Sequence, residues 1–244
     1  MRTYGLIGYP LTHSFSEKYF ANKFWQLGIS DAEYFTFSIP SIDDLHQIIK
    51  THQNLCGFNI TIPYKKLVLA FLNDADDTVK AMSACNCVSI KDGHLIGYNT
   101  DVVGFEHSLK PFLKPHHNKA LILGTGGAAA AVEFVLKKLH IRYHLVSRNA
   151  TLNNLNYADL NESIMSTHHL IINTSPVGQF PNVDQAPSIP YQFITSEHHL
   201  FDLIYNPTET AFLQKGKAMG SSIQNGYEML VLQAEESWRI WNEK

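Results

Sequence analysis

The chain has 244 residues, of which 45% are hydrophobic and 17% are charged, and its formal net charge is -3 at pH 7. This composition is typical of a soluble globular protein, and the length suffices for two lobes that each bury a core. The sequence has no block of like charges and no apolar run near the roughly 18 residues that span a bilayer. We therefore expect no nucleic-acid partner and no membrane segment.

The cysteines and histidines bear on metal binding and on the compartment. Cys56, Cys85 and Cys87 are odd in number and are not spaced like a zinc site or a disulfide framework. Several of the thirteen histidines form adjacent pairs, whose side chains diverge on a helix or a strand. We therefore expect reduced thiols, a cytoplasmic protein and no metal site.

Short apolar runs alternate with helical patterns in the first hundred residues, as in α/β proteins. Helices are predicted to open at Ser41 and at Pro63. Asp92-Gly93 predicts a hairpin turn between two strands. The strands are predicted at residues 4–8, 34–37, 55–60, 87–90 and 94–97.

The first helix of the chain has clear boundary signals. Ser16 can cap its start and Gly28 can end it. Phe20, Phe24 and Leu27 recur at helical spacing, so they predict its buried stripe.

A second unit is predicted after the helical pattern breaks around residues 111–118. A helix is expected at 130–139, and the last helix, at 227–241, carries an apolar face that needs a partner surface. Four further apolar runs predict a parallel, doubly wound sheet. These strands are expected at residues 120–123, 143–147, 170–173 and 200–203.

A glycine-rich turn follows the first of these strands. Gly124, Gly126 and Ala129 have the G-x-G-x-x-G/A spacing between a strand and a helix. Glycines let the backbone approach a pyrophosphate, and the helix N-terminus supplies unpaired N–H groups. The alternative, a tight turn without a ligand, stays open.

The end of the next strand indicates which nicotinamide cofactor binds. Where an acidic residue would bind the ribose of NAD, the chain has Ser147, Arg148 and Asn149. A guanidinium can bind a phosphate, so the pattern favours NADP. An ordinary surface arginine is the alternative.

Polar side chains gather at strand ends in the first lobe. Asn59 and Thr61 are two residues apart on one face, and Lys65 follows them. Asn86 and Asp101 flank the predicted hairpin. Each could be a turn or cap residue, but together they suit a polyhydroxylated substrate.

The motifs together resemble the shikimate dehydrogenase family, and the matches run from Tyr4 to Gln233. Their order and spacing make the resemblance specific. The motifs are His13-Ser-Phe-Ser, Gly57-Phe-Asn-Ile-Thr-Ile-Pro-Tyr-Lys, Gly97-Tyr-Asn-Thr-Asp, the Gly124 turn and Tyr205-Asn-Pro-Thr-Glu-Thr.

The resemblance implies an α/β fold with two lobes. Residues 1–101 would form an N-terminal substrate-binding lobe, completed by a helix at 226–244. Residues 102–225 would form a Rossmann-like, doubly wound NADP-binding lobe. The implied enzyme is an NADP-dependent oxidoreductase that reversibly reduces 3-dehydroshikimate to shikimate, in aromatic amino acid and chorismate biosynthesis. It would be a monomer or a homodimer.

The resemblance also implies the site, with Lys65 and Asp101 as the catalytic pair. Substrate would be bound by Ser14, Ser16, Thr61, Lys65, Asn86, Asp101, Tyr205 and Gln233. NADP would be bound by Gly124, Thr125, Gly126, Gly127, Ala128, Ser147, Arg148, Asn149, Leu203 and Gly226. No metal is implied.

Some positions depart from the family pattern. Glu17 replaces a proline, Cys87 a threonine, Ser147 an asparagine and Gln179 a methionine. The chain is also short, so loops are expected to be trimmed within residues 149–167. Two alternatives stay open: a quinate/shikimate dehydrogenase of broader specificity, and a non-catalytic sensor that binds NADP and a shikimate-like ligand.

Overall fold

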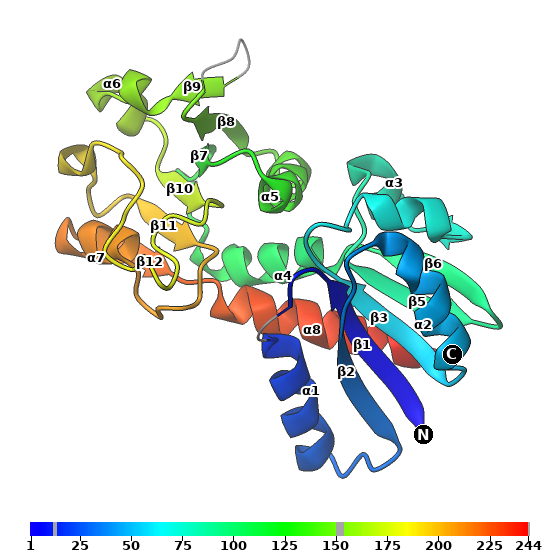
Figure 1. Ribbon diagram of the computed structural model, residues 1–244. Coiled ribbons are helices and arrows are strands. Elements are labelled where there is room, and N and C mark those ends of the chain that lie inside the picture. Colours follow the sequence, from blue (N-terminus) through cyan, green and yellow to red (C-terminus); the bar gives the residue numbers. More distant parts are fainter. Residues whose placement is uncertain (12–13, 150–153, 244) are drawn as a thin grey trace. The chain divides into compact units, whose positions relative to one another are not determined.

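The computed structural model describes residues 1–11, 14–149 and 154–243 (Figure 1). The chain divides into two compact units, the first containing Met1–Thr100 and Ala234–Lys244 and the second containing Asp101–Gln233. Each unit is built around one six-stranded sheet, so the predicted α/β class with two lobes is confirmed.

The sheet of the first unit has the strand order β2-β1-β3-β5-β6-β4. Strand β1 is parallel to β2 and β3, whereas β5 is antiparallel to β3 and β6. The predicted hairpin turn is confirmed, and Asp92 and Gly93 both have positive φ angles, 51° and 78°. The strands are β1 (Arg2–Gly8), β2 (Ala32–Ser38), β3 (Leu55–Ile60), β4 (Asp74–Ala75), β5 (Cys87–Lys91) and β6 (His94–Tyr98).

The first helix begins earlier than predicted, because Ser14 rather than Ser16 is its N-cap. Phe20 and Phe24 are buried as predicted, but Leu27 is 60% exposed, so the predicted stripe is wrong at its end. Leu27 is the C-cap, where the chain leaves the helix. The helices are α1 (Phe15–Gln26), α2 (Leu45–Thr51), α3 (Asp77–Met82) and the part of α8 (Tyr227–Asn242) from Ala234 onward.

The helix predicted at Pro63 is wrong. The N–H of Tyr64 bonds back to the Thr61 carbonyl at 2.9 Å, and the Tyr64 hydroxyl donates to the Ile39 carbonyl. Residues 62–66 thus form turns, anchored by the buried Tyr64 side chain. A short 3₁₀ helix, Leu67–Phe71, follows them.

Two apolar clusters cover the sheet of the first unit. Tyr4 and Ile7 of β1 belong to different clusters, because residues an odd number apart on a strand point to opposite faces. The Tyr4 cluster is aromatic, with Trp241 of α8 stacked on Tyr4 at a centroid distance of 4.8 Å. The Trp241 indole also donates to the Val88 carbonyl at 2.9 Å, which fixes the end of α8 within this unit.

The sheet of the second unit has the order β12-β11-β10-β7-β8-β9, with every pair parallel. The order reverses beside β7, so this is the predicted doubly wound arrangement. Side chains from β7, β10 and β11 form its core. The strands are β7 (Lys119–Leu123), β8 (Arg142–Ser147), β9 (Asn154–Asn156), β10 (Leu170–Asn173), β11 (His199–Asp202) and β12 (Ser222–Gln224).

The helices of the second unit include the one that follows the glycine turn, α5, whose observed start lies three residues before the predicted one. Between β9 and β10 the described chain has only a 3₁₀ turn and a four-residue helix. The predicted trimming at 149–167 falls partly on residues 150–153, outside the described residues. The helices are α4 (Thr100–Leu109), α5 (Gly127–Lys138), α6 (Glu162–Met165), α7 (Ala211–Ala218) and the start of α8.

Two features are not found among the described residues. None of their helices combines the length and apolarity needed to cross a bilayer. Their His, Cys, Asp and Glu side chains form no group of three that could hold a metal ion.

Candidate functional site

Parallel strands β1 and β3 bring the segments that follow them together at one edge of the first sheet. The Thr61 N–H donates to the Ile7 carbonyl at 2.9 Å. Gly8 permits this approach, because a Cβ there would lie 2.5 Å from the Thr61 methyl group. Thr61 therefore stands beside the segment that leads to α1.

The start of α1 carries two hydroxyl groups predicted to bind substrate. Ser14 accepts a hydrogen bond from the Glu17 N–H at 3.2 Å, and Ser16 is buried in the first turn. The Glu17 carboxylate accepts a bond from the Thr36 hydroxyl at 2.7 Å. A cavity of about 600 Å³ opens here, and Ser14, Glu17 and Thr36 are among its lining residues. His13, the first residue of the motif, lies outside the described residues.

Lys65 lies in the turn after β3, not in the first turn of a helix as predicted. Its carbonyl accepts a bond from the Cys85 N–H at 2.8 Å. Asn86 follows directly and is 3% exposed. The first unit thus brings Lys65 and Asn86 close along the backbone, at the strand edge that also carries Thr61.

The glycine turn of the second unit has the geometry that a bound phosphate requires. Gly124 has a φ of 117°, and a Cβ there would lie 2.9 Å from the Thr174 hydroxyl. Gly126 is the N-cap of α5 and Gly127 its first residue, and a Cβ on either would meet nothing within 4 Å. The helix N-terminus is therefore open to a ligand, and its N–H groups favour an anion.

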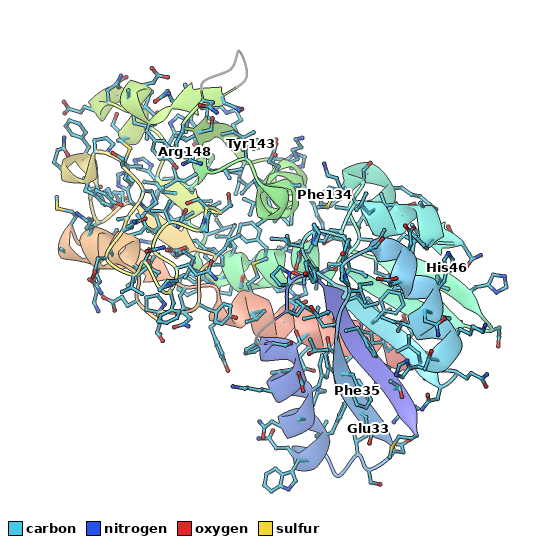
Figure 2. The ribbon with its side chains drawn as sticks, in the orientation of Figure 1. Glu33, Phe35, His46, Phe134, Tyr143 and Arg148 are labelled. Atoms are coloured by element: carbon cyan, nitrogen blue, oxygen red, sulfur yellow. The ribbon has the colours of Figure 1, made fainter. Side chains whose placement is uncertain are left out.

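A cavity of about 650 Å³ adjoins this turn. Arg148, labelled in Figure 2, follows β8. It is the one charged side chain among the described residues that line the cavity. The Asn156 amide donates to the Arg148 carbonyl at 3.0 Å, and the Ser147 hydroxyl donates to the Asn149 carbonyl at 2.6 Å. The backbone at Arg148 is thus fixed while its guanidinium faces solvent and the cavity.

Leu203 and Gly226 meet at the ends of β11 and β12. The Gly226 N–H donates to the Ile204 carbonyl at 3.0 Å, and a Cβ on Gly226 would overlap the Leu203 carbonyl. Only glycine fits here. Tyr205 comes two residues after Leu203 and is 38% exposed.

Asp101 and Gln233 lie on helices that pack together within the second unit. Asp101 is in the first turn of α4. Gly104 allows close contact with α8, because a Cβ there would lie 2.6 Å from the Met229 carbonyl and 3.1 Å from the Gln233 Cβ. Lys65 belongs to the other unit, so its pairing with Asp101 stays a prediction.

Several residues of the second cavity were not predicted as site residues. Thr174 and Ser175 line it, as do Asn156 and Tyr157. The run Asn173-Thr-Ser after an apolar strand carries a signal for this site, because it repeats the pattern of polar residues at a strand end. Asn156 and Tyr157 carry no comparable periodic signal.

An open glycine turn and a cavity at the switch point of a parallel sheet define a dinucleotide-binding protein of the α/β class. The model of the shikimate dehydrogenase substrate binding domain matches residues 6–88. The shikimate dehydrogenase (NADP(+)) of Methanococcus vannielii is 35% identical, over 97% of this chain and 90% of that protein. The chain therefore belongs to the shikimate dehydrogenase family.

Solved structures extend the likeness over the whole chain. Shikimate 5-dehydrogenase from Thermus thermophilus, in complex with NADP(H) and shikimate, is 28% identical with a TM-score of 0.87, covering 100% of this chain and 94% of that chain. The ligand-free 5-ketofructose reductase of a Gluconobacter species is also 28% identical, with a TM-score of 0.86 and coverage of 100% and 93%. Both proteins share the fold.

Proposed function

We propose that the chain is an NADP-dependent oxidoreductase that reversibly reduces 3-dehydroshikimate to shikimate. The observation that carries this proposal is the 35% identity to a shikimate dehydrogenase (NADP(+)) over 97% of the chain. The reaction belongs to the biosynthesis of chorismate and the aromatic amino acids. The proposed function assigns a role to each unit, because the first would hold the substrate and the second the cofactor.

The residues of the second unit fit NADP. The open turn at Gly126 and Gly127 would receive the pyrophosphate against the start of α5. Arg148 would bind the 2′-phosphate, and the cavity has no described carboxylate to repel it. When bound, the nicotinamide supplies the hydride. The remaining proposed contacts are Gly124, Thr125, Ala128, Ser147, Asn149, Leu203 and Gly226.

The residues of the first unit fit a polyhydroxylated carboxylic acid. The Ser14 and Ser16 hydroxyls, at the positive end of the α1 dipole, would bind the substrate carboxylate. Thr61, Lys65 and Asn86 would contact the ring hydroxyls. From the second unit, the proposed contacts are Asp101, Tyr205 and Gln233.

Lys65 and Asp101 are the proposed acid and base. Reduction of a ketone places negative charge on its oxygen, which must take up a proton. The Lys65 ammonium donates that proton and then takes it back in the reverse direction. Asp101 orients the ammonium and shares the proton, so the two groups act on the same substrate oxygen.

Two alternatives compete with this proposal, one differing in the substrate and the other in whether turnover follows binding. A quinate/shikimate dehydrogenase would also oxidise a substrate with an extra ring hydroxyl, and the 5-ketofructose reductase shows that this fold also serves another ketone. A non-catalytic sensor would bind NADP and shikimate without turnover. The presence of both Lys65 and Asp101 favours an enzyme over a sensor.

The proposal is tested by initial rates, followed through the ultraviolet absorbance of NADPH. The assays use shikimate and quinate with the oxidised cofactors, NADP and NAD. They use 5-ketofructose with the reduced cofactors, NADPH and NADH. The highest kcat/KM is expected for shikimate with NADP. A higher value for quinate, or binding without turnover, would replace the proposal by the corresponding alternative. A higher value for 5-ketofructose would overturn the proposed substrate.

Location and assembly are further proposals. Cys56, Cys85 and Cys87 are free thiols, which fits a reducing compartment such as the cytoplasm. The proposed assembly is a monomer or a homodimer.

A further inference from the structure

A buried network of polar side chains lies beneath the proposed substrate residues of the first unit. Its members come from β2, β3, the segment before β5, the start of α4 and α8. All are at most 8% exposed, so water cannot replace a lost hydrogen-bond partner. The members are Tyr34, Asn59, Asn86, Thr100 and Ser237.

Asn59 is fixed by bonds at both ends of its amide. The Tyr34 hydroxyl donates to its Oδ1 at 2.9 Å, while its Nδ2 donates to the Ser237 Oγ at 2.8 Å. The Asn86 carbonyl is a second, longer acceptor for Nδ2, at 3.3 Å. Ser237 is therefore the better of the two acceptors that orient this amide.

The Tyr34 end of the network reaches the first turn of α1. Burial raises the pKa of Tyr34, and the contact of its hydroxyl with the Ser16 hydroxyl acts against that rise. The Tyr34 ring stacks on Phe20 at 4.6 Å, so α1 and β2 are joined by an apolar and a polar contact.

The other end of the network holds Asn86. The Asn86 Oδ1 accepts a bond from the Thr100 N–H at 2.7 Å, and its Nδ2 donates to the Thr100 Oγ1 at 3.1 Å. The Thr100 Oγ1 in turn lies 3.3 Å from the Ser237 Oγ. Ser237 thus joins the bonds that fix Asn59 to those that fix Asn86.

Cys87 is the neighbour of Ser237 on β5. Its thiol is fully buried. A thiol is a weak hydrogen-bond partner compared with a hydroxyl. The Ser237 hydroxyl contacts the Cys87 thiol, which places the side chain of residue 87 beside the network.

We propose that Ser237 is a positioning residue for the substrate site, acting through Asn59 on Ser16 and through Thr100 on Asn86. This inference rests on the proposed function. Ser237 does not contact the substrate in this proposal. It holds the Ser16 and Asn86 side chains in one arrangement. Loss of its hydroxyl removes the shorter bond of the Asn59 Nδ2 and leaves the longer one to the Asn86 carbonyl.

The test is the KM for each substrate in Ser237→Ala. The KM for shikimate should rise about tenfold while the KM for NADP stays within twofold, because only the first unit is disturbed. Ser108→Ala is the matched control, since Ser108 is a fully buried helical serine of the second unit that bonds to the Phe105 carbonyl. It should lower thermal stability without changing the KM for shikimate.

A rescue variant distinguishes a positioning role of Ser237 from a general loss of packing in Ser237→Ala. The double variant Cys87→Thr with Ser237→Ala returns a hydroxyl to the network from β5, and it should recover most of the affinity for shikimate. If Ser237→Ala does not fold, Tyr34→Phe is the second variant. It removes the hydrogen bond from Tyr34 to Asn59, so it should also raise the KM for shikimate.

The outcomes are distinct. An unchanged KM for shikimate in a folded Ser237→Ala, with an active wild type, overturns this inference and leaves the proposed function standing. Equal increases in both KM values, or no rescue by Cys87→Thr, also overturn it. A wild type that never turns over shikimate overturns the proposed function, and this inference falls with it.

Discussion

The Thr210 hydroxyl donates a hydrogen bond of 2.6 Å to the Asp202 carboxylate at the end of β11. The same carboxylate accepts bonds from the Asn173 amide at 3.0 Å and the Ile204 N–H at 3.1 Å. Burial raises the Asp202 pKa to about 6, against the lowering effect of these bonds. The network ties the ends of β10 and β11 to the loop that carries Tyr205.

Thr210→Val should destabilise the second unit by about 2 kcal/mol. The change removes a hydroxyl bond to a buried carboxylate and the N-cap of α7, where Thr210 accepts from the Leu213 N–H. Denaturant unfolding measures the loss. Thr208→Val, at an exposed position of the same loop, should change stability by at most about 0.5 kcal/mol. Similar losses in both variants would show that the Asp202 network does not carry this stability.

Arg148→Ala should raise the KM for NADP by roughly one to two powers of ten and leave that for NAD within a few fold. The guanidinium is the one charged group among the described residues lining the cavity, and only NADP carries the extra phosphate. Steady-state kinetics with both cofactors measure the difference. Arg142→Ala is the matched control, since Arg142 is exposed at the other end of β8. Equal effects on both cofactors would remove Arg148 as the discriminating residue.

The combined change Ser14→Gly and Ser16→Ala should mainly raise the KM for shikimate and leave kcat within a few fold. Both hydroxyls are proposed to bind the carboxylate, which does not change during the reaction. Glycine is chosen for position 14 because it keeps most of the N-cap stability of α1. Kinetics at several shikimate concentrations separate the two constants. A collapse of kcat at unchanged KM would assign these serines to the reaction itself.

Acid should destabilise the second unit through its buried histidines. Burial lowers the pKa of His117, His168 and His198, and that of His199 to about 4. The folded state therefore disfavours their protonation, so stability is complete above the unfolded pKa of about 6.5 and falls as the pH drops toward 4. Asp202 acts in the opposite direction, because its raised pKa adds stability below about 6.

The four histidines outnumber that one carboxyl, so the free energy of unfolding should decline between about pH 7 and pH 5. Urea titrations across this range measure the slope. His199→Gln should flatten it, whereas His94→Gln, at an exposed hairpin position, should not. A stability that is constant or rises toward pH 5 would contradict the assignment of these histidines.

The elements that the sequence predicts correctly are those with a local signal. The glycine turn at Gly124, the strands around it and the hairpin at Asp92 follow from periodicity and backbone conformation, which neighbouring residues determine. The predictions that are wrong concern residues whose structure depends on a contact distant in the sequence. Ser14 and Ser16 are equally good caps by type, and Ser16 is instead buried against Tyr34.

The same limit applies to the candidate site. Nothing near Pro63 indicates that Tyr64 bonds to the distant Ile39 carbonyl, or that turns replace a helix there. The cavity residues Asn156 and Tyr157 come from a short strand and turn without apolar periodicity. Ser237 was predicted only as part of a helix, and its polar role depends on three other elements of the first unit.

The most direct test of the central claim compares wild type with Lys65→Ala in one assay of NADPH formation from shikimate and NADP. The account predicts turnover by the wild type and a kcat lower by on the order of 100-fold or more in Lys65→Ala, as loss of a general acid or base typically gives. Binding of shikimate and NADP, measured by calorimetry, should persist in the variant. A near-wild-type kcat in Lys65→Ala, or no NADPH from a folded wild type, would contradict it.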